Sequence, residues 1–207
     1  MSGAAAGAPA PARRRARSRP TQRLDDLVRA TPWMLRVLRA ARSADLPQCW
    51  VGGGVLRDLV WDSAVGRFDP ARVRDVDVAF FDAADLSPHR DRRADLALRA
   101  VEPDVPWEAT NQAAVHTWYA AAFGDEVPPL RSTLDGVRTW PETATSVAVR
   151  LDDADRLHVT GVAGGLPDLL GLVHRRNPRR VSVEEYRRRL ARRDFVDRWP
   201  HVQVVPE

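Results

Sequence analysis

Apolar and polar positions along this chain follow two periodicities, one typical of strands and one typical of helices. Short apolar runs at 48–51, 73–81 and 105–110 have the length and composition of strands. Two further runs, 143–151 and 157–162, flank a polar turn rich in Asp and predict a hairpin. Helices are predicted at 55–64, 88–101, 133–140, 166–174 and 183–199, and one more from Pro32 onward.

Several of these helices begin at recognisable capping residues. Thr31 stands before Pro32, Ser87 stands before Pro88, and Ser132 precedes the helix that ends near Trp140. Ser182, with an acid three residues later, forms a capping box for the last helix. The order of elements predicts an α+β fold in which helices flank a small mixed sheet.

The first 20 residues break this pattern and change the interpretation of charge. They are mostly Ala, Pro, Gly, Ser and Arg, so we expect a disordered tail over 1–20 and one domain over 21–207. The chain carries a net charge of +4, but the tail holds five Arg and no acid, leaving 27 basic and 28 acidic residues elsewhere. Every basic residue is Arg. Basicity is therefore no argument for a nucleic-acid partner.

Composition also bears on where the protein acts. No apolar stretch approaches the length of a membrane span, and no apolar segment follows the basic N-terminal residues. Cys49 is the single cysteine, so no internal disulfide can form. We expect a cytoplasmic protein that makes no membrane contact.

The first candidate for chemistry is the glycine run Gly52-Gly53-Gly54, between a predicted strand and a predicted helix. Glycines let the backbone turn sharply and approach a ligand, and the N-terminus of the next helix is a natural anion site. A purely structural turn explains such a run equally well. The spacing matches neither the dinucleotide-binding fingerprint nor the P-loop.

The second candidate is the pair Asp75 and Asp77 in the predicted strand 73–81. Acids separated by one residue project from the same strand face, and two close carboxylates repel unless a cation lies between them. Hard oxygen ligands favour Mg²⁺ or Mn²⁺. A solvated strand face is the alternative.

Together the two motifs resemble the signature of the DNA polymerase beta nucleotidyltransferase superfamily, in which a strand ends in Gly-Gly, a helix follows, and Asp-x-Asp lies on the next strand. The stretch 53–58 is also similar to the Gly-Gly-x-Val-Arg-Asp stretch of tRNA-nucleotidyltransferase and poly(A) polymerase relatives. The chain beyond about residue 33 looks like an uncharacterised bacterial branch named only nucleotidyltransferase family protein. That likeness rests on Trp107-Glu108, Asn111-Gln112, His116, Arg131-Ser132-Thr133 and 140–145.

The resemblance implies a third carboxylate on a neighbouring strand, and Glu108 is the best match. Asp75, Asp77 and Glu108 would then be catalytic and would hold two metal ions, with Glu108 as the base or ligand nearest the acceptor. A surface carboxylate is the alternative for Glu108. The chain departs from the pattern in the 20 residues between Gly54 and Asp75, which predict an inserted loop over 66–74.

Weaker candidates for nucleotide binding are Arg57, Asn111 and Arg131. Arg57 could contact phosphate or form a surface pair with Asp58. The amides of Asn111 and its neighbour Gln112 could contact a base or sugar, although a turn role explains Asn111 equally well. Arg131 could contact phosphate beside Ser132 and Thr133.

Two other features favour structural roles. His116, near Trp118 and Tyr119, is more readily explained as a packed histidine than as a catalytic one. The last helix carries an Arg-rich face that we expect to be solvated and salt-bridged, with a docking surface for RNA as the alternative. Its members are Arg187, Arg188, Arg189, Arg192 and Arg193.

The sequence therefore predicts a metal-dependent nucleotidyltransferase that moves a nucleoside monophosphate from an NTP to a hydroxyl. The acceptor, a small molecule, RNA end or protein side chain, is left open, as is the oligomeric state. The alternatives are a non-catalytic nucleotide- or RNA-binding module and a toxin–antitoxin-type partner protein with the same fold.

Overall fold

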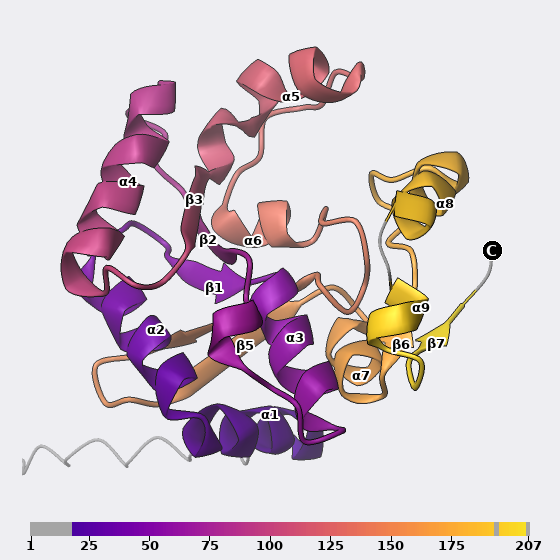
Figure 1. The fold of residues 1–207 in the computed structure, drawn as a ribbon. Coiled ribbons are helices and arrows are strands. Elements are labelled where there is room, and N and C mark those ends of the chain that lie inside the picture. Colours follow the sequence, from indigo (N-terminus) through magenta and orange to yellow (C-terminus); the bar gives the residue numbers. More distant parts are fainter. Residues whose placement is uncertain (1–17, 193–194, 206–207) are drawn as a thin grey trace, which may run out of the picture.

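The computed structural model describes residues 18–192 and 195–205, and a mixed sheet lies at its centre (Figure 1). Within these residues the sheet has five strands in the order β3-β2-β1-β4-β5. Strands β2 and β3 are parallel, whereas the other neighbours are antiparallel, and β4 and β5 form the predicted hairpin. The strands are β1 (Trp50–Gly52), β2 (Val76–Phe80), β3 (Trp107–Asn111), β4 (Val147–Leu151) and β5 (Leu157–Gly161).

Helices flank this sheet, so the predicted α+β class with a small mixed sheet is confirmed. A second, two-stranded parallel sheet joins β6 (Val173–His174) to β7 (Gln203–Val204) near the C-terminus. The helices are α1 (Arg19–Ala30), α2 (Pro32–Ser43), α3 (Gly54–Ser63), α4 (Pro88–Val101), α5 (Val115–Phe123), α6 (Thr133–Val137), α7 (Gly165–Leu170), α8 (Val183–Arg192) and α9 (Phe195–Arg198), with short 3-10 turns at Pro70–Arg72 and Gln112–Ala114.

Helix α1 was not predicted, and it begins inside the segment 1–20 that the sequence assigns to a disordered tail. Ser18 caps it by accepting a hydrogen bond from the Thr21 amide, and Leu24 and Val28 are fully buried. These two apolar residues are four apart and so share one helix face. The rest of the predicted tail, 1–17, lies outside the described residues.

Several predicted boundaries were wrong. Strand β2 begins at Val76, so Asp75 precedes the strand instead of lying on it. The helix predicted over 166–174 ends at Leu170, because Gly171 and then Leu172, whose φ is 57°, turn the chain into β6. Of the last helix, predicted to continue to Trp199, the structure describes α8 up to Arg192 and α9 over Phe195–Arg198, and residues 193–194 between them lie outside the described residues.

The two faces of the sheet are covered unequally. Strand residues that point to one face, such as Val51, Val78 and Val149, pack into the main core with α1 to α4. The opposite face carries a small cluster around Trp50, Ala79 and Ala148 that packs against α6. Because side chains alternate along a strand, Asp77 and Glu108 point to this second, thinly covered face.

No helix in the described part of the chain has the length and apolar character needed to cross a membrane.

Candidate active site

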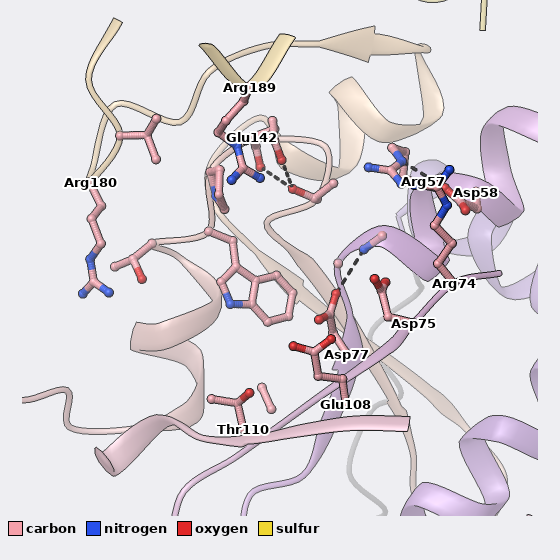
Figure 2. Close-up of a pocket in the computed structure, with 18 of the residues that line it drawn as sticks. Arg57, Asp58, Arg74, Asp75, Asp77, Glu108, Thr110, Glu142, Arg180 and Arg189 are labelled. Carbon is pink, nitrogen blue, oxygen red and sulfur yellow. Dashed lines mark hydrogen bonds and ion pairs between the residues drawn. The ribbon is translucent and has the colours of Figure 1, made fainter. Parts of the chain in front are cut away.

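A cleft of about 860 Å³ lies over the second face of the sheet (Figure 2). Its floor is the turn Gly53–Gly54 with Asp77 and Glu108, and Asp75 lies at its edge. Its other walls come from distant parts of the chain: the 3-10 turn before β2, helix α5, the segment 139–145, and residues 180–199. The cleft therefore collects acids, arginines and aromatic rings around one open space.

Asp77 and Glu108 are brought together by the parallel pairing of β2 with β3. They are direct partners in the register of the two strands, so their side chains are neighbours on the cleft face. Asp75 is also close to the turn, because a Cβ placed on Gly54 would lie 3.4 Å from Asp75 Oδ1. The structure thus places all three predicted carboxylates at the cleft.

The ionised form of Asp77 is disfavoured by its surroundings. Burial is the main cause of a rise in its pKa to about 7, and the charges of Asp75 and Glu108 add to it. The Gly54 amide, which donates to Asp77 Oδ2 at 3.3 Å, opposes this rise. The pKa of Glu108 is also raised, first by burial and then by Asp75. Such mutual repulsion is expected where carboxylates share a site for a cation.

The chemistry of this donor set fits a hard divalent cation, although its geometry is not that of a closed metal centre. Carboxylate oxygens are hard ligands of the kind that Mg²⁺ and Mn²⁺ prefer. Among the described residues, however, no group of three or more His, Cys, Asp or Glu side chains is arranged to hold a metal ion. Asp75, Asp77 and Glu108 are the residues that could bind one after side-chain adjustment.

The three glycines have different roles. Gly53 has a φ of 68°, and a Cβ there would overlap Asp77 Oδ2. Gly54 lies at the first position of α3 and donates its amide to Asp77. Gly52 instead packs against β4, since a Cβ there would lie 2.5 Å from the Val147 carbonyl oxygen, and it does not line the cleft. The structure therefore gives Gly52 a packing role, whereas the sequence predicted that it contacts a nucleotide.

Arg57 lines the cleft, but it is also part of a buried ion-pair network. Its Nε and Nη2 donate to Asp58 Oδ1 at 3.0 and 2.8 Å. The predicted pair of Arg57 with Asp58 therefore exists, but both side chains are buried, so the pair does not lie on the surface. Arg198 donates to Asp58 and to Asp62, at 3.0 and 2.8 Å. This network fixes the C-terminal segment onto α3.

Asn111 does not line the cleft, and its amide is fully used within the protein. It is completely buried, accepts from the amides of Asp82 and Ala113, and donates to the carbonyls of Asp82 and Asp85. The predicted base or sugar contact is therefore wrong, and the turn role is the one observed. The neighbouring Gln112 does line the cleft.

Arg131 and His116 also lie outside the cleft. Arg131 is exposed and lines a separate hollow of about 730 Å³, which shares Tyr119, Thr139 and Arg180 with the cleft. Ser132 is an N-cap, accepting from the Asp135 amide at 3.2 Å. His116 is half-buried and is not among the residues that line the cleft.

The sequence did not identify several cleft residues beyond β3. Glu142 is buried, and its carboxylate accepts from Arg189 Nε at 3.1 Å and from Thr145 Oγ1 at 2.8 Å. Arg180 packs over the Tyr119 ring, and burial lowers its pKa. Arg189 belongs to the Arg-rich face that the sequence predicts to be solvated, but it pairs with Glu142 and lines the cleft. Arg188, on the same helix, does form exposed ion pairs with acids one turn away. Glu142 lies in the stretch 140–145, on which the family resemblance partly rests, but nothing in the sequence assigned this residue a role in the site.

Comparisons with known proteins bear on the family and on the fold. The family model described as Nucleotidyltransferase matches residues 39–204, and the chain belongs to this family.

A solved NMR structure, described as revealing a CCA-adding enzyme head domain, is 26% identical to this chain. Its TM-score is 0.73, and the match covers 90% of this chain and 96% of that one. Family and likeness together support a general role in nucleotidyl transfer.

Two longer proteins share the fold at lower identity. One is a CCA-adding enzyme in complex with CTP, at 14% identity and a TM-score of 0.51, covering 89% of this chain and 43% of that chain. The other is the Thermotoga maritima CCA-adding enzyme complexed with tRNA, at 17% identity and a TM-score of 0.53, covering 88% and 42%. This chain thus spans less than half of either. No curated protein matches this chain.

Proposed function

We propose that this protein transfers a nucleoside monophosphate from an NTP to a hydroxyl acceptor with the help of Mg²⁺ or Mn²⁺. The observation that carries the proposal is the pairing of Asp77 with Glu108 beside the Gly53–Gly54 turn on the floor of the cleft. Acids on adjacent strands next to a tight turn into a helix supply the two needs of this reaction, which are cation binding and phosphate binding.

The glycine turn and the arginines of the cleft would hold the triphosphate. Backbone N–H groups at the start of α3 point toward an anion placed there. Arg74 lines the same side of the cleft and Arg180 the opposite side, and neither forms an ion pair with a carboxylate among the described residues (Figure 2). These two guanidinium groups are suited to phosphate oxygens.

Asp75, Asp77 and Glu108 would hold the cation, which supplies charge neutralisation at the phosphate and acidification of the acceptor hydroxyl. Glu108 also has a role of its own. It reaches into the open part of the cleft, and its raised pKa suits a carboxylate that accepts a proton from the attacking hydroxyl. The acceptor oxygen forms the new bond to the α-phosphorus, and pyrophosphate is the leaving group.

Similar proteins suggest candidates for the substrates. CTP is bound in one solved structure with this fold and tRNA in another, so a nucleoside triphosphate and an RNA end are the first donor and acceptor to test. Small-molecule hydroxyls and protein side chains are tested alongside them. A nucleotide-binding module without turnover is the competing function, and the absence of a closed three-ligand cluster among the described residues favours it.

The experiment incubates purified protein with each α-labelled NTP and Mg²⁺ or Mn²⁺, with and without total cell RNA. We expect labelled product from the wild type and at least a 100-fold loss in Asp77→Asn and Glu108→Gln. Asp26→Asn, an exposed acid on α1, is the matched control and should retain full activity. Product that survives Asp77→Asn would sink the mechanism, and NTP binding without any product would favour the binding module.

A further inference from the structure

Trp140 is an aromatic side chain of the cleft whose backbone is held unusually firmly. Its carbonyl oxygen accepts from Asn177 Nδ2 at 2.8 Å and from Ser146 Oγ at 3.0 Å, and its amide donates to the Val137 carbonyl. Asn177 and Ser146 are both buried, and they are also hydrogen-bonded to each other at 3.1 Å. Position 140 is therefore fixed by a polar network that lies outside the cleft.

The indole ring is seated by Gly52. A Cβ at that glycine would lie 2.8 Å from Trp140 Cζ3, so the ring occupies space that any other residue would fill. Trp140 packs partly into the small cluster formed by Trp50, Ala79, Val137 and Ala148, and the rest of it lines the cleft. Gly52 therefore explains how a flat ring comes to lie against the backbone of β1.

This ring lies close to the catalytic floor. Gly52 is the direct partner of Asp77 in the antiparallel pairing of β1 with β2, and Gly53 and Gly54 follow it at once. Paired Cα atoms in such a ladder are about 5 Å apart. The indole thus packs against the residue that is the direct strand partner of Asp77.

Trp140 also differs from the other aromatic residues of the cleft. Trp118, Tyr119 and Phe123 contact one another on α5, with ring centroids 4.7 to 6.4 Å apart. Trp118 and Phe123 are 38% and 61% exposed. Within the described residues Trp140 has no ring partner and no hydrogen bond to its indole nitrogen, so its cleft side offers an open aromatic surface.

We propose that Trp140 is the platform on which the base of the incoming nucleotide stacks. This inference rests on the proposed function and specifies how that site holds its donor substrate. Every nucleobase has a flat π surface, so stacking on a fixed indole gives affinity with little dependence on the base. The wider purine ring overlaps the indole more, and we expect ATP and GTP to bind somewhat better than CTP and UTP.

The test compares the binding of ATP and of inorganic tripolyphosphate, each with Mg²⁺, to four proteins by calorimetry. We expect Trp140→Ala to weaken ATP about 10- to 100-fold, and Trp140→Phe to stay within about threefold of the wild type. Tripolyphosphate, which has no base, should bind all proteins alike. Trp33→Ala is the matched control, since it removes a half-buried indole of α2 that does not line the cleft, and it should bind ATP as the wild type does.

Folding is kept separate from binding in this design. If Trp140→Ala is unfolded by thermal melting, Trp140→Leu replaces it, and the comparison with Trp140→Phe tests the ring itself. Equal ATP affinity in Trp140→Ala and wild type overturns the inference and leaves the proposed function standing, and so does equal weakening of ATP and tripolyphosphate. Failure of the wild type to bind any NTP overturns both.

Discussion

Asp77 shows how the fold holds an acidic side chain of the cleft at some cost to its own stability. Its carboxylate receives one hydrogen bond, from the Gly54 amide, while burial and two neighbouring acids oppose its charge. Without a cation, the ionised side chain is therefore unfavourable in the folded state. Unfavourable groups of this kind concentrate at functional sites.

The first prediction concerns the stability of the cation-free protein. The pKa of Asp77 is about 7 in the fold and about 3.9 in an unfolded chain, so the folded state binds the proton more tightly. Stability should fall as the pH rises from about 4 and level off above pH 7. Asp77→Asn removes this contribution and should be more stable than the wild type at pH 8 by at most about 4 kcal/mol, with a smaller gain at pH 5.

Urea unfolding in EDTA at pH 5, 6, 7 and 8 measures the difference. Comparing the two proteins at each pH cancels the titration of the groups that do not interact with Asp77. A constant difference across this range would show that Asp77 has an ordinary pKa.

The second prediction concerns the glycine turn. Gly53 combines a φ of 68° with a ψ of −135°, a conformation essentially reserved for glycine, and the Cβ of Gly53→Ala would also meet Asp77 Oδ2. Gly66 has a φ of 66°, and a Cβ there would have no atom within 4 Å, so Gly66→Ala should lose about 1 kcal/mol and Gly53→Ala about 2–3 kcal/mol. Nucleotide affinity should fall in Gly53→Ala alone. Similar losses in both variants would mean that the turn tolerates a Cβ.

At the scale of elements, helix α3 is the one on which the cleft depends. Residues Val55 to Asp62 are all buried, because the sheet core covers one side of the helix and the C-terminal segment covers another. Its buried charges are satisfied by Arg198, which contacts Asp58 and Asp62, and by the Trp199 indole N–H, which donates to Asp62 at 2.7 Å. The helix that begins at the glycine turn is thus held by residues about 140 positions away.

The third prediction tests this attachment. Arg198→Ala leaves two buried carboxylates without their shared partner and should destabilise the protein by about 2–4 kcal/mol. The control is Arg188→Ala on α8, where the paired acids, Glu184 and Glu185, are exposed and the loss should be under about 0.5 kcal/mol. Urea unfolding of the two variants measures both values, and equal losses would mean that the Arg198 contacts contribute no more than a surface pair.

The same scale shows what the sequence could and could not predict. Local pattern was sufficient for the β4–β5 hairpin and the start of α4, since both depend on neighbouring residues. It also placed Asp77 and Glu108 on strands. Local pattern could not predict that these two strands pair in parallel, with Asp77 opposite Glu108. Asn111 shows why a local motif can mislead: its side-chain amide donates to the carbonyls of Asp82 and Asp85, so it is not available to a ligand.

For the whole molecule, the cleft exists because distant segments close around one face of the sheet. Residues within 53–77 form one side, and residues within 180–189 and 197–199 form another (Figure 2). Glu142 interacts with both sides: although burial acts to raise the pKa of this carboxyl, Arg189, His174, Thr145 and Arg57 bring it below its ordinary value. A ligand that contacts both sides should therefore stabilise α8 together with the glycine turn.

The last prediction tests that coupling by hydrogen exchange. ATP with Mg²⁺ at ten times its Kd should slow exchange by up to about 10-fold, both in 52–63 and in α8, because opening either segment would release the ligand. Glu142→Gln keeps the shape of the side chain but removes the charge that holds Arg189, so protection should persist in 52–63 and decrease in α8. Glu126→Gln, an exposed acid of the neighbouring hollow, should leave both segments protected. If ATP protects only 52–63 in the wild type, the C-terminal wall takes no part in binding, and the nucleotide is held by the sheet side alone.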